Sequence, residues 1–198
     1  ANVHITGDVK GRSQGKLYLQ RIQDSTLVIL DSMVINGDSK FESHIKLDSP
    51  EVLYLTLDRG QTNSVDNSLP FFAEPGDIKI ETSLKAFFSE AKISGSKNHD
   101  LWMKFDSINK RFNEENLVLI EKRLKNEIKP NPTTADSIEQ AYQKLLKRKY
   151  RYTAHFAVTN GNKEIAPYLV LSEIADINTP YLDTIQKSMT PEVAKSKY

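Results

Sequence analysis

Apolar residues recur at every second position within short runs of the first half of the chain. Ile5 and Val9, or Leu17 and Leu19, keep this even spacing. Such alternation predicts β-strands with one face on a core. The runs are "HITGDV", "KLYLQRI", "STLVILDSMVIN", "KFESHIKL", "VLYLTL", "LPFFAE", "DIKIE" and "KAFFSEAKI". About eight short strands separated by turn signals indicate an antiparallel β-sandwich.

The apolar period changes to that of an α-helix in the second half. An apolar stripe at helical spacing predicts a helix of about 30 residues, one arm of a long helical hairpin. Pro130 and Pro132 are expected to end it, and Thr133, Thr134 or Asp136 to cap the next helix. The stripe consists of Leu101, Phe105, Ile108, Phe112, Leu117, Ile120, Leu124 and Ile128.

Further helices are expected after that hairpin turn. The second helix would direct Ile138, Tyr142, Leu145 and Tyr152 or Phe156 inward until "NGN" breaks it. Two shorter helices are predicted at "KEIAPYLVLSEIAD" and "TPYLDTIQKSM". The fold class predicted is therefore α+β, a β-sandwich followed by a helical region.

Glycine content divides the chain at the same place as the apolar period. All glycines except Gly161 lie at or before Gly95, which predicts a β-sandwich domain over 1–95 and a helical region over 96–198. Leu101, Trp102 and Phe105, at the start of the long helix, are predicted to pack on the sandwich.

The segment "EPGD" at 74–77 places two carboxylates beside a turn. Pro75 favours the corner of a turn and Gly76 supplies a positive φ, so a tight hairpin is predicted. Glu74 and Asp77 are then interpreted as solvated flanking residues rather than an acid–base pair. The polar segment 58–68 is the loop where we would first look for binding.

Net charge, cysteine content and the length of the apolar runs limit the classes of function that the chain can have. The formal net charge of +1 predicts neither a nucleic-acid nor a membrane-surface partner, and the basic run "KLLKRKYRY" is interpreted as a solvated helix face. The chain has 0 cysteines, which excludes thiol nucleophiles, disulfides and zinc–thiolate sites. Its apolar runs are too short to span a bilayer.

The histidines are the remaining candidates for metal binding or catalysis. His4, His44, His99 and His155 show no pair at helical ligand spacing, so we expect no metal site, and no cofactor. The stretch "GSKNHDLW" around His99 is interpreted as a helix start, with Ser96 or Asn98 as N-cap. No catalytic residue is predicted.

The order of several segments resembles a known family. "ITGDV", "GKLYL", "LDSMVINGDSKFES", "FFAEPGDIKI", "AKISGSKNHDLW" and "TPYLDTIQKSMTPEVAKSKY" are similar to a domain of unknown function found in Gram-negative envelope proteins. In that family the domain precedes a thioredoxin-like domain of the disulfide-reductase type. The resemblance implies either a piece of such a longer protein or a stand-alone member.

We therefore expect a non-catalytic envelope module that positions or recognises a partner, accessory to a thiol–disulfide or surface assembly. The partner would be a protein or a glycan, and the location the periplasm or an outer-membrane-attached lipoprotein. Membrane contact would come only through a lipid anchor outside this chain. One alternative is a glycan- or peptide-binding surface protein, marked by exposed clustered aromatics. The other is a hydrolase that combines His99 with carboxylates of the 58–68 loop.

Overall fold

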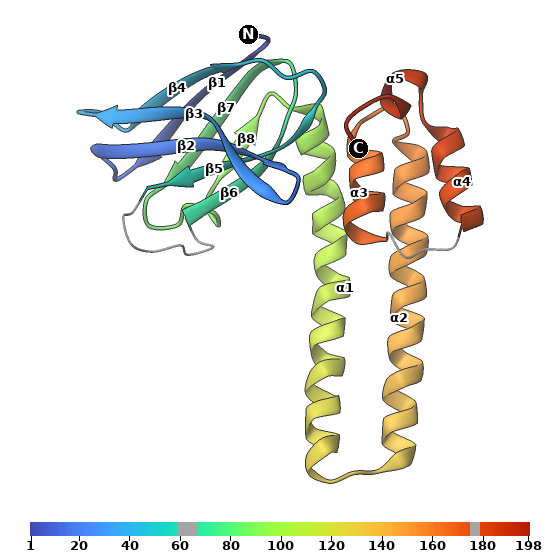
Figure 1. Ribbon diagram of the computed structural model, residues 1–198. Helices are drawn as coiled ribbons and strands as arrows, with labels where there is room; N and C mark the ends of the chain where they lie inside the picture. The colour runs from blue at the N-terminus through green and yellow to red at the C-terminus, as the bar shows by residue number, and fades with distance from the viewer. Residues whose placement is uncertain (59–66, 175–178) are drawn as a thin grey trace. The chain divides into compact units, whose positions relative to one another are not determined.

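The computed structural model describes residues 1–58, 67–174 and 179–198 (Figure 1). They divide into two compact units, Ala1–Asp100 with Lys197 and Leu101–Ser196 with Tyr198. The boundary lies inside the first helix. The predicted boundary at 95–96 and the predicted docking of Leu101, Trp102 and Phe105 stay predictions.

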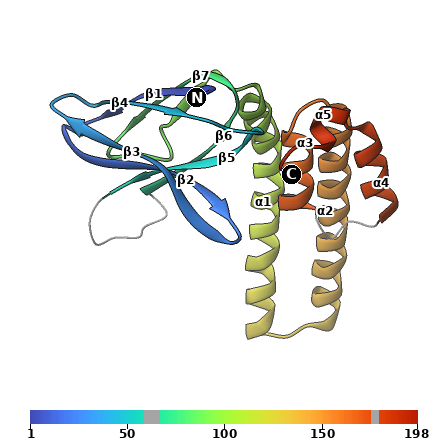
Figure 2. The ribbon, with the colours of Figure 1, turned by 45° about the horizontal axis from the view of Figure 1, so that its top comes forward.

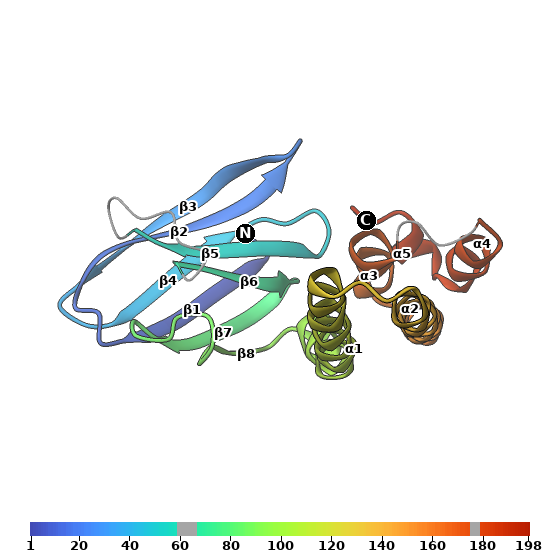
Figure 3. The ribbon, with the colours of Figure 1, turned by 90° about the horizontal axis from the view of Figure 1, so that it is seen from below.

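The first unit is a β-sandwich. Figure 3 shows its two four-stranded sheets as separate layers, with strand orders β4-β1-β7-β8 and β3-β2-β5-β6. The strands are β1 (Val3–Lys10), β2 (Gln14–Gln23), β3 (Thr26–Asn36), β4 (Lys40–Ile45), β5 (Glu51–Leu57), β6 (Ser68–Ala73), β7 (Gly76–Ser83) and β8 (Lys92–Ser94). The predicted fold class is confirmed, with one addition: β1 and β7 pair in parallel.

The predicted "EPGD" hairpin is wrong. β6 pairs with β5 in one sheet, whereas β7 pairs with β1 and β8 in the other. Residues 74 and 75 therefore connect the two sheets. Alternating flanks and a Pro-Gly pair favour a turn, but they do not specify that both flanks join the same sheet.

The expected eighth strand is also shorter than predicted. Most of "KAFFSEAKI" forms turns, and only Lys92–Ser94 pairs with β7. Phe87 is buried in the core from this turn segment. The aromatic side chain thus comes from a turn and not from an alternating strand.

Alternation along the strands builds the core. In β1, Val3, Ile5 and Val9 point inward and are almost fully buried. Gly7 occupies the remaining inward position of β1, and an added Cβ there would lie 2.2 Å from the Phe41 ring of the neighbouring strand. The missing side chain of Gly7 makes room for that ring. Further core residues are Leu17, Leu19, Leu53, Leu55, Phe71, Ile78 and Ile80.

The β2–β3 hairpin continues beyond its pairing with the neighbouring strand β5. Pairing of β2 with β5 covers only Leu17–Gln20, while β2 and β3 remain paired as far as Gln23 and Thr26. Asp24 and Ser25 both have positive φ, 51° and 66°, as a two-residue type I′ turn requires. The tip of the hairpin is therefore a two-stranded ribbon.

The second unit contains the helices, drawn from yellow-green to red in Figure 2. They are α1 (Lys97–Ile128), which begins in the first unit, α2 (Pro132–Thr159), α3 (Ile165–Glu173), α4 (Thr179–Ser188) and α5 (Pro191–Ala194). Phe105 of α1 packs against Tyr152 and Phe156 of α2, each at 5.5 Å between ring centroids. Among the described helices, none combines the length and apolar character that crossing a membrane requires.

Two details of the predicted helical hairpin are wrong. Asn131 is the N-cap of α2 and Pro132 is its first residue, so Pro132 opens a helix rather than ending one. The cap is therefore none of Thr133, Thr134 and Asp136. The distal part of the apolar stripe of α1 is exposed, with Ile128 at 81%. Leu119, between Val118 and Ile120, is buried in its place.

Candidate functional site

Four ionisable side chains lie together on the outer face of the β4-β1-β7-β8 sheet. His4 on β1 is directly opposite His44 on β4 and opposite Asp77 on β7. Glu42 precedes His44 by two residues and so points to the same side of β4. We call His4, Glu42, His44 and Asp77 the histidine–carboxylate cluster.

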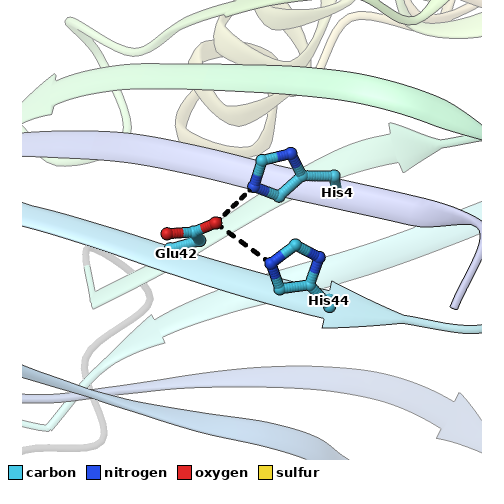
Figure 4. Close-up of side chains that lie close together, drawn as sticks. All are labelled: His4, Glu42 and His44. Carbon is cyan, nitrogen blue, oxygen red and sulfur yellow. Dashed lines mark hydrogen bonds and ion pairs between the residues drawn. The ribbon is translucent and has the colours of Figure 1, made fainter.

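The Glu42 carboxylate is at the centre of this cluster. Its Oε1 atom lies 2.7 Å from His4 Nε2 and 3.0 Å from His44 Nε2 (Figure 4). Asp77 Oδ1 is 3.2 Å from the other ring nitrogen of His4, Nδ1. The two imidazole rings are stacked, with centroids 4.2 Å apart. One carboxylate oxygen therefore joins two histidines on adjacent strands.

The cluster changes the acidity of its members. The hydrogen bond to Glu42 raises the pKa of His4, loss of solvation partly opposes this, and Asp77 adds to the rise. Hydrogen bonds from His4 and then His44 lower the pKa of Glu42. The arrangement therefore favours an ionised Glu42 carboxylate beside a protonated His4.

Sequence reasoning missed this cluster because it searched for ligand pairs at helical spacing. On a strand the relevant spacing is two, which "ESH" at 42–44 provides. His4 joins it only through the pairing register of β1 and β4. The two-residue spacing of Glu42 and His44 can be recognised in the sequence, whereas the pairing register of β1 and β4 cannot.

Glu74 contributes to a second polar arrangement, at the start of α1. Its Oε1 accepts hydrogen bonds from the Asn98 backbone N–H at 2.8 Å and from the Ser96 hydroxyl at 3.0 Å. Ser96 in turn accepts from the His99 N–H at 3.0 Å, which confirms Ser96 as the N-cap. The interpretation of Glu74 as a solvated flanking residue is wrong, because it stabilises the positive end of a helix.

His99 is held within this helix start. Its Nδ1 accepts a hydrogen bond from the Phe72 N–H at 3.2 Å, and its side chain is buried. Burial lowers the pKa of His99, and the charge of Asp100 partly opposes that shift. The neutral ring thus links β6 to α1. Of the two loop carboxylates suggested as its catalytic partners, Asp58 accepts a hydrogen bond from the Tyr18 hydroxyl, and Asp66 lies outside the described residues.

The tip of the β2–β3 hairpin carries exposed aliphatic side chains. Ile22, Leu27 and Ile29 are 46%, 53% and 55% exposed. Ile22 is paired with Leu27, and Ile29 lies two residues further along β3, so all three point to one side of the ribbon. We call them the hairpin patch.

Aromatic and basic residues were the other sequence candidates. Tyr18 and Tyr54 share the outer face of β2 and β5, but both are half-buried, and the Tyr18 hydroxyl donates to Asp58 at 3.1 Å. In the basic run of α2, Arg148 pairs with Glu115 and Lys149 with Glu173. These pairs neutralise part of the run.

These features define a two-sheet β-sandwich whose last strand leads into a capped long helix. The chain belongs to the family of the domain of unknown function DUF4369, whose model matches residues 3–102. That match spans both sheets and the start of α1, including Glu74, Ser96 and His99. No curated protein matches the sequence.

Proposed function

We propose that this chain is a non-catalytic module of the Gram-negative envelope that holds a protein partner through the hairpin patch. The module acts in the periplasm or on the outer membrane, as an accessory to a thiol–disulfide or surface assembly. The observation that carries the proposal is the exposure of Ile22, Leu27 and Ile29 together at the tip of a hairpin that extends beyond its pairing with β5.

The hairpin patch offers two kinds of contact. Three neighbouring branched side chains lose their contact with water when a partner covers them, at about 25 cal/mol per Å² of apolar surface. β3 is also the outermost strand of its sheet in the described part of the chain, so its backbone can pair with a strand of the partner. Apolar burial supplies affinity and strand pairing supplies orientation.

Two observations support a non-catalytic role. His99, the strongest catalytic candidate in the sequence, uses Nδ1 to accept a backbone hydrogen bond inside the fold. The chain also has 0 cysteines, so any thiol–disulfide chemistry must come from another domain or protein. The module then serves to position the partner on which that chemistry acts.

Site-specific crosslinking in the native organism tests the proposal. A photo-crosslinking residue at Leu27 should give one discrete protein adduct in the envelope fraction. The same residue at Val34, an exposed aliphatic position of β3 away from the tip, is the matched control and should give little or none. The double variant Leu27→Thr/Ile29→Thr, which places strand-favouring β-branched side chains at both positions, should weaken partner binding at least tenfold with Tm unchanged.

Equal adducts from both positions would overturn the proposed interface. A glycan ligand would leave Leu27 without a protein adduct, which would also overturn it. An adduct confined to the cytoplasmic fraction would contradict the envelope location.

A further inference from the structure

We propose that His4, Glu42 and His44 bind a divalent transition-metal ion of the zinc type, with Asp77 orienting His4. This inference goes beyond the proposed function, because the histidine–carboxylate cluster is on one sheet and the hairpin patch on the other. Either proposal can fail without the other.

The first argument is the separation of the three donor groups. One ligand atom from each of His4, Glu42 and His44 lies within 4.8 Å of the others. Neighbouring ligands around a tetrahedral zinc ion are about 3.3 Å apart, as metal–ligand bonds of about 2.0–2.1 Å require. The Glu42 Oε1 distances of 2.7 and 3.0 Å to the two Nε2 atoms would need to open by only a few tenths of an ångström.

The second argument is the position of Asp77. A histidine that binds a metal through one ring nitrogen usually donates its other N–H to a carboxylate. Asp77 Oδ1 lies 3.2 Å from His4 Nδ1, while His4 Nε2 faces Glu42. When an ion replaces the proton on Nε2, an Nδ1–H donated to Asp77 keeps His4 in the tautomer whose Nε2 binds the ion.

The third argument is the rigidity of the support. His4 and His44 are directly paired in the register of β1 and β4, and the backbone of His4 is held on both sides, by β4 and by β7. A bound metal lies in the plane of each imidazole, so the stacked rings must turn about χ2 to share an ion. Figure 4 shows His4 on β1 beside Glu42 and His44 on β4, and these partly exposed side chains can turn without disturbing the core.

The donor set selects the type of metal. Two imidazoles and one carboxylate suit Zn²⁺, Cu²⁺ or Ni²⁺, whereas Mg²⁺ and Ca²⁺ prefer sets made of oxygen ligands. Three protein ligands on an exposed face leave a coordination position for water or for a group from another molecule. The site is therefore open and not a closed structural centre.

Calorimetric titration of tag-free protein with ZnCl₂ at pH 7.5 tests the proposal. We expect one Zn²⁺ per chain and a rise of Tm with zinc, and no rise with MgCl₂ or CaCl₂ at equal concentration. His44→Ala should abolish this binding, and Glu42→Gln should weaken it at least tenfold. Asp77→Asn should weaken it about tenfold with the stoichiometry kept, as loss of an orienting carboxylate does.

Matched controls separate this site from unspecific binding. His155→Ala removes an exposed histidine of α2, and Glu81→Gln removes an exposed carboxylate from the same sheet face, so both should bind zinc like the unmodified protein. The variants are checked for folding by circular dichroism. Zinc binding that survives His44→Ala unchanged, or that is lost with His155→Ala, would overturn the proposal, and so would the absence of zinc binding.

Discussion

Within the described part of the chain, the two units of this protein leave different kinds of buried polar atom without a hydrogen-bond partner. In the sandwich, the buried Thr82 hydroxyl donates to the Phe87 carbonyl at 2.6 Å, and the buried Ser96 hydroxyl shares its one proton between the Phe72 carbonyl at 2.7 Å and Glu74 Oε1 at 3.0 Å. In the helical unit, Asn109 Oδ1 and Thr153 Oγ1 are buried without a hydrogen-bond partner among the described residues. Arg12 Nε and Arg21 Nε of the sandwich are also buried without a partner, but both guanidinium groups form other polar contacts, whereas the Thr153 hydroxyl forms none among the described residues.

The largest effect should follow from a change where the sandwich backbone is tightly packed. A Cβ at Gly95 would lie 2.0 Å from the Asp77 carbonyl oxygen, and φ there is +94°. Gly95→Ala should therefore lower the free energy of unfolding by roughly 3 kcal/mol or more, measured by urea denaturation. The strain and the backbone clash act together.

Gly76 is the matched control for that variant. Its φ is +122°, but a Cβ there would meet nothing within 4 Å. Gly76→Ala should cost only about 1 kcal/mol, from backbone strain alone. Equal losses at the two glycines would show that close packing does not distinguish them.

The next largest change in stability should be found at Glu74 and not at Asp77, the two carboxylates of "EPGD". Glu74→Ala removes the acceptor for the Asn98 N–H and the Ser96 hydroxyl, and should cost about 1–2 kcal/mol in urea denaturation. Asp77→Ala, in zinc-free buffer, removes a largely exposed side chain and should change stability by less than about 0.5 kcal/mol. If both variants were neutral, the helix-capping role of Glu74 would be wrong.

A smaller effect is expected from acidification at the helix start. Burial lowers the pKa of His99 in the folded protein, so between about pH 6.5 and that lower value the unfolded chain binds a proton that the folded chain does not. His99 therefore makes stability fall as pH decreases through this range. His4, with its raised pKa, contributes in the opposite direction.

The His99→Asn variant isolates this contribution. An Asn oxygen can still accept the Phe72 N–H but does not titrate near neutral pH. Tm measured from pH 7.5 to 5.5 should fall less in His99→Asn than in the unmodified protein. An identical pH dependence of the two would show that His99 does not titrate differently on folding.

How far the sequence predicts the fold depends on whether a feature is local. Alternation placed Ile5, Val9, Leu17 and Leu19 in a core correctly, because strand periodicity is a local property. The sheet partner of β7 and the approach of His4 to His44 depend on pairing between distant segments, which no local pattern encodes.

The helical stripe shows a different limit. Leu117, Leu124 and Ile128 keep a helical period, yet they are exposed, while Leu119 is buried. Periodicity identifies an apolar face but does not say which face meets the second helix. In this arm the contact with α2 is made by aromatic residues such as Phe112 and by ion pairs such as Glu115 with Arg148.

The smallest expected effect is a gain of stability in the helical unit, which would sharpen the comparison of the two units. Thr153 is completely buried in α2, and its hydroxyl has no hydrogen-bond partner among the described residues. Thr153→Val keeps the shape and the helix propensity while removing a desolvated polar group, so thermal unfolding should show a gain of about 0.5–1 kcal/mol. Thr159→Val, at an exposed position of the same helix, should stay within about 0.5 kcal/mol. A loss of stability in Thr153→Val would mean that the hydroxyl is satisfied, and this contrast between the two units would then disappear.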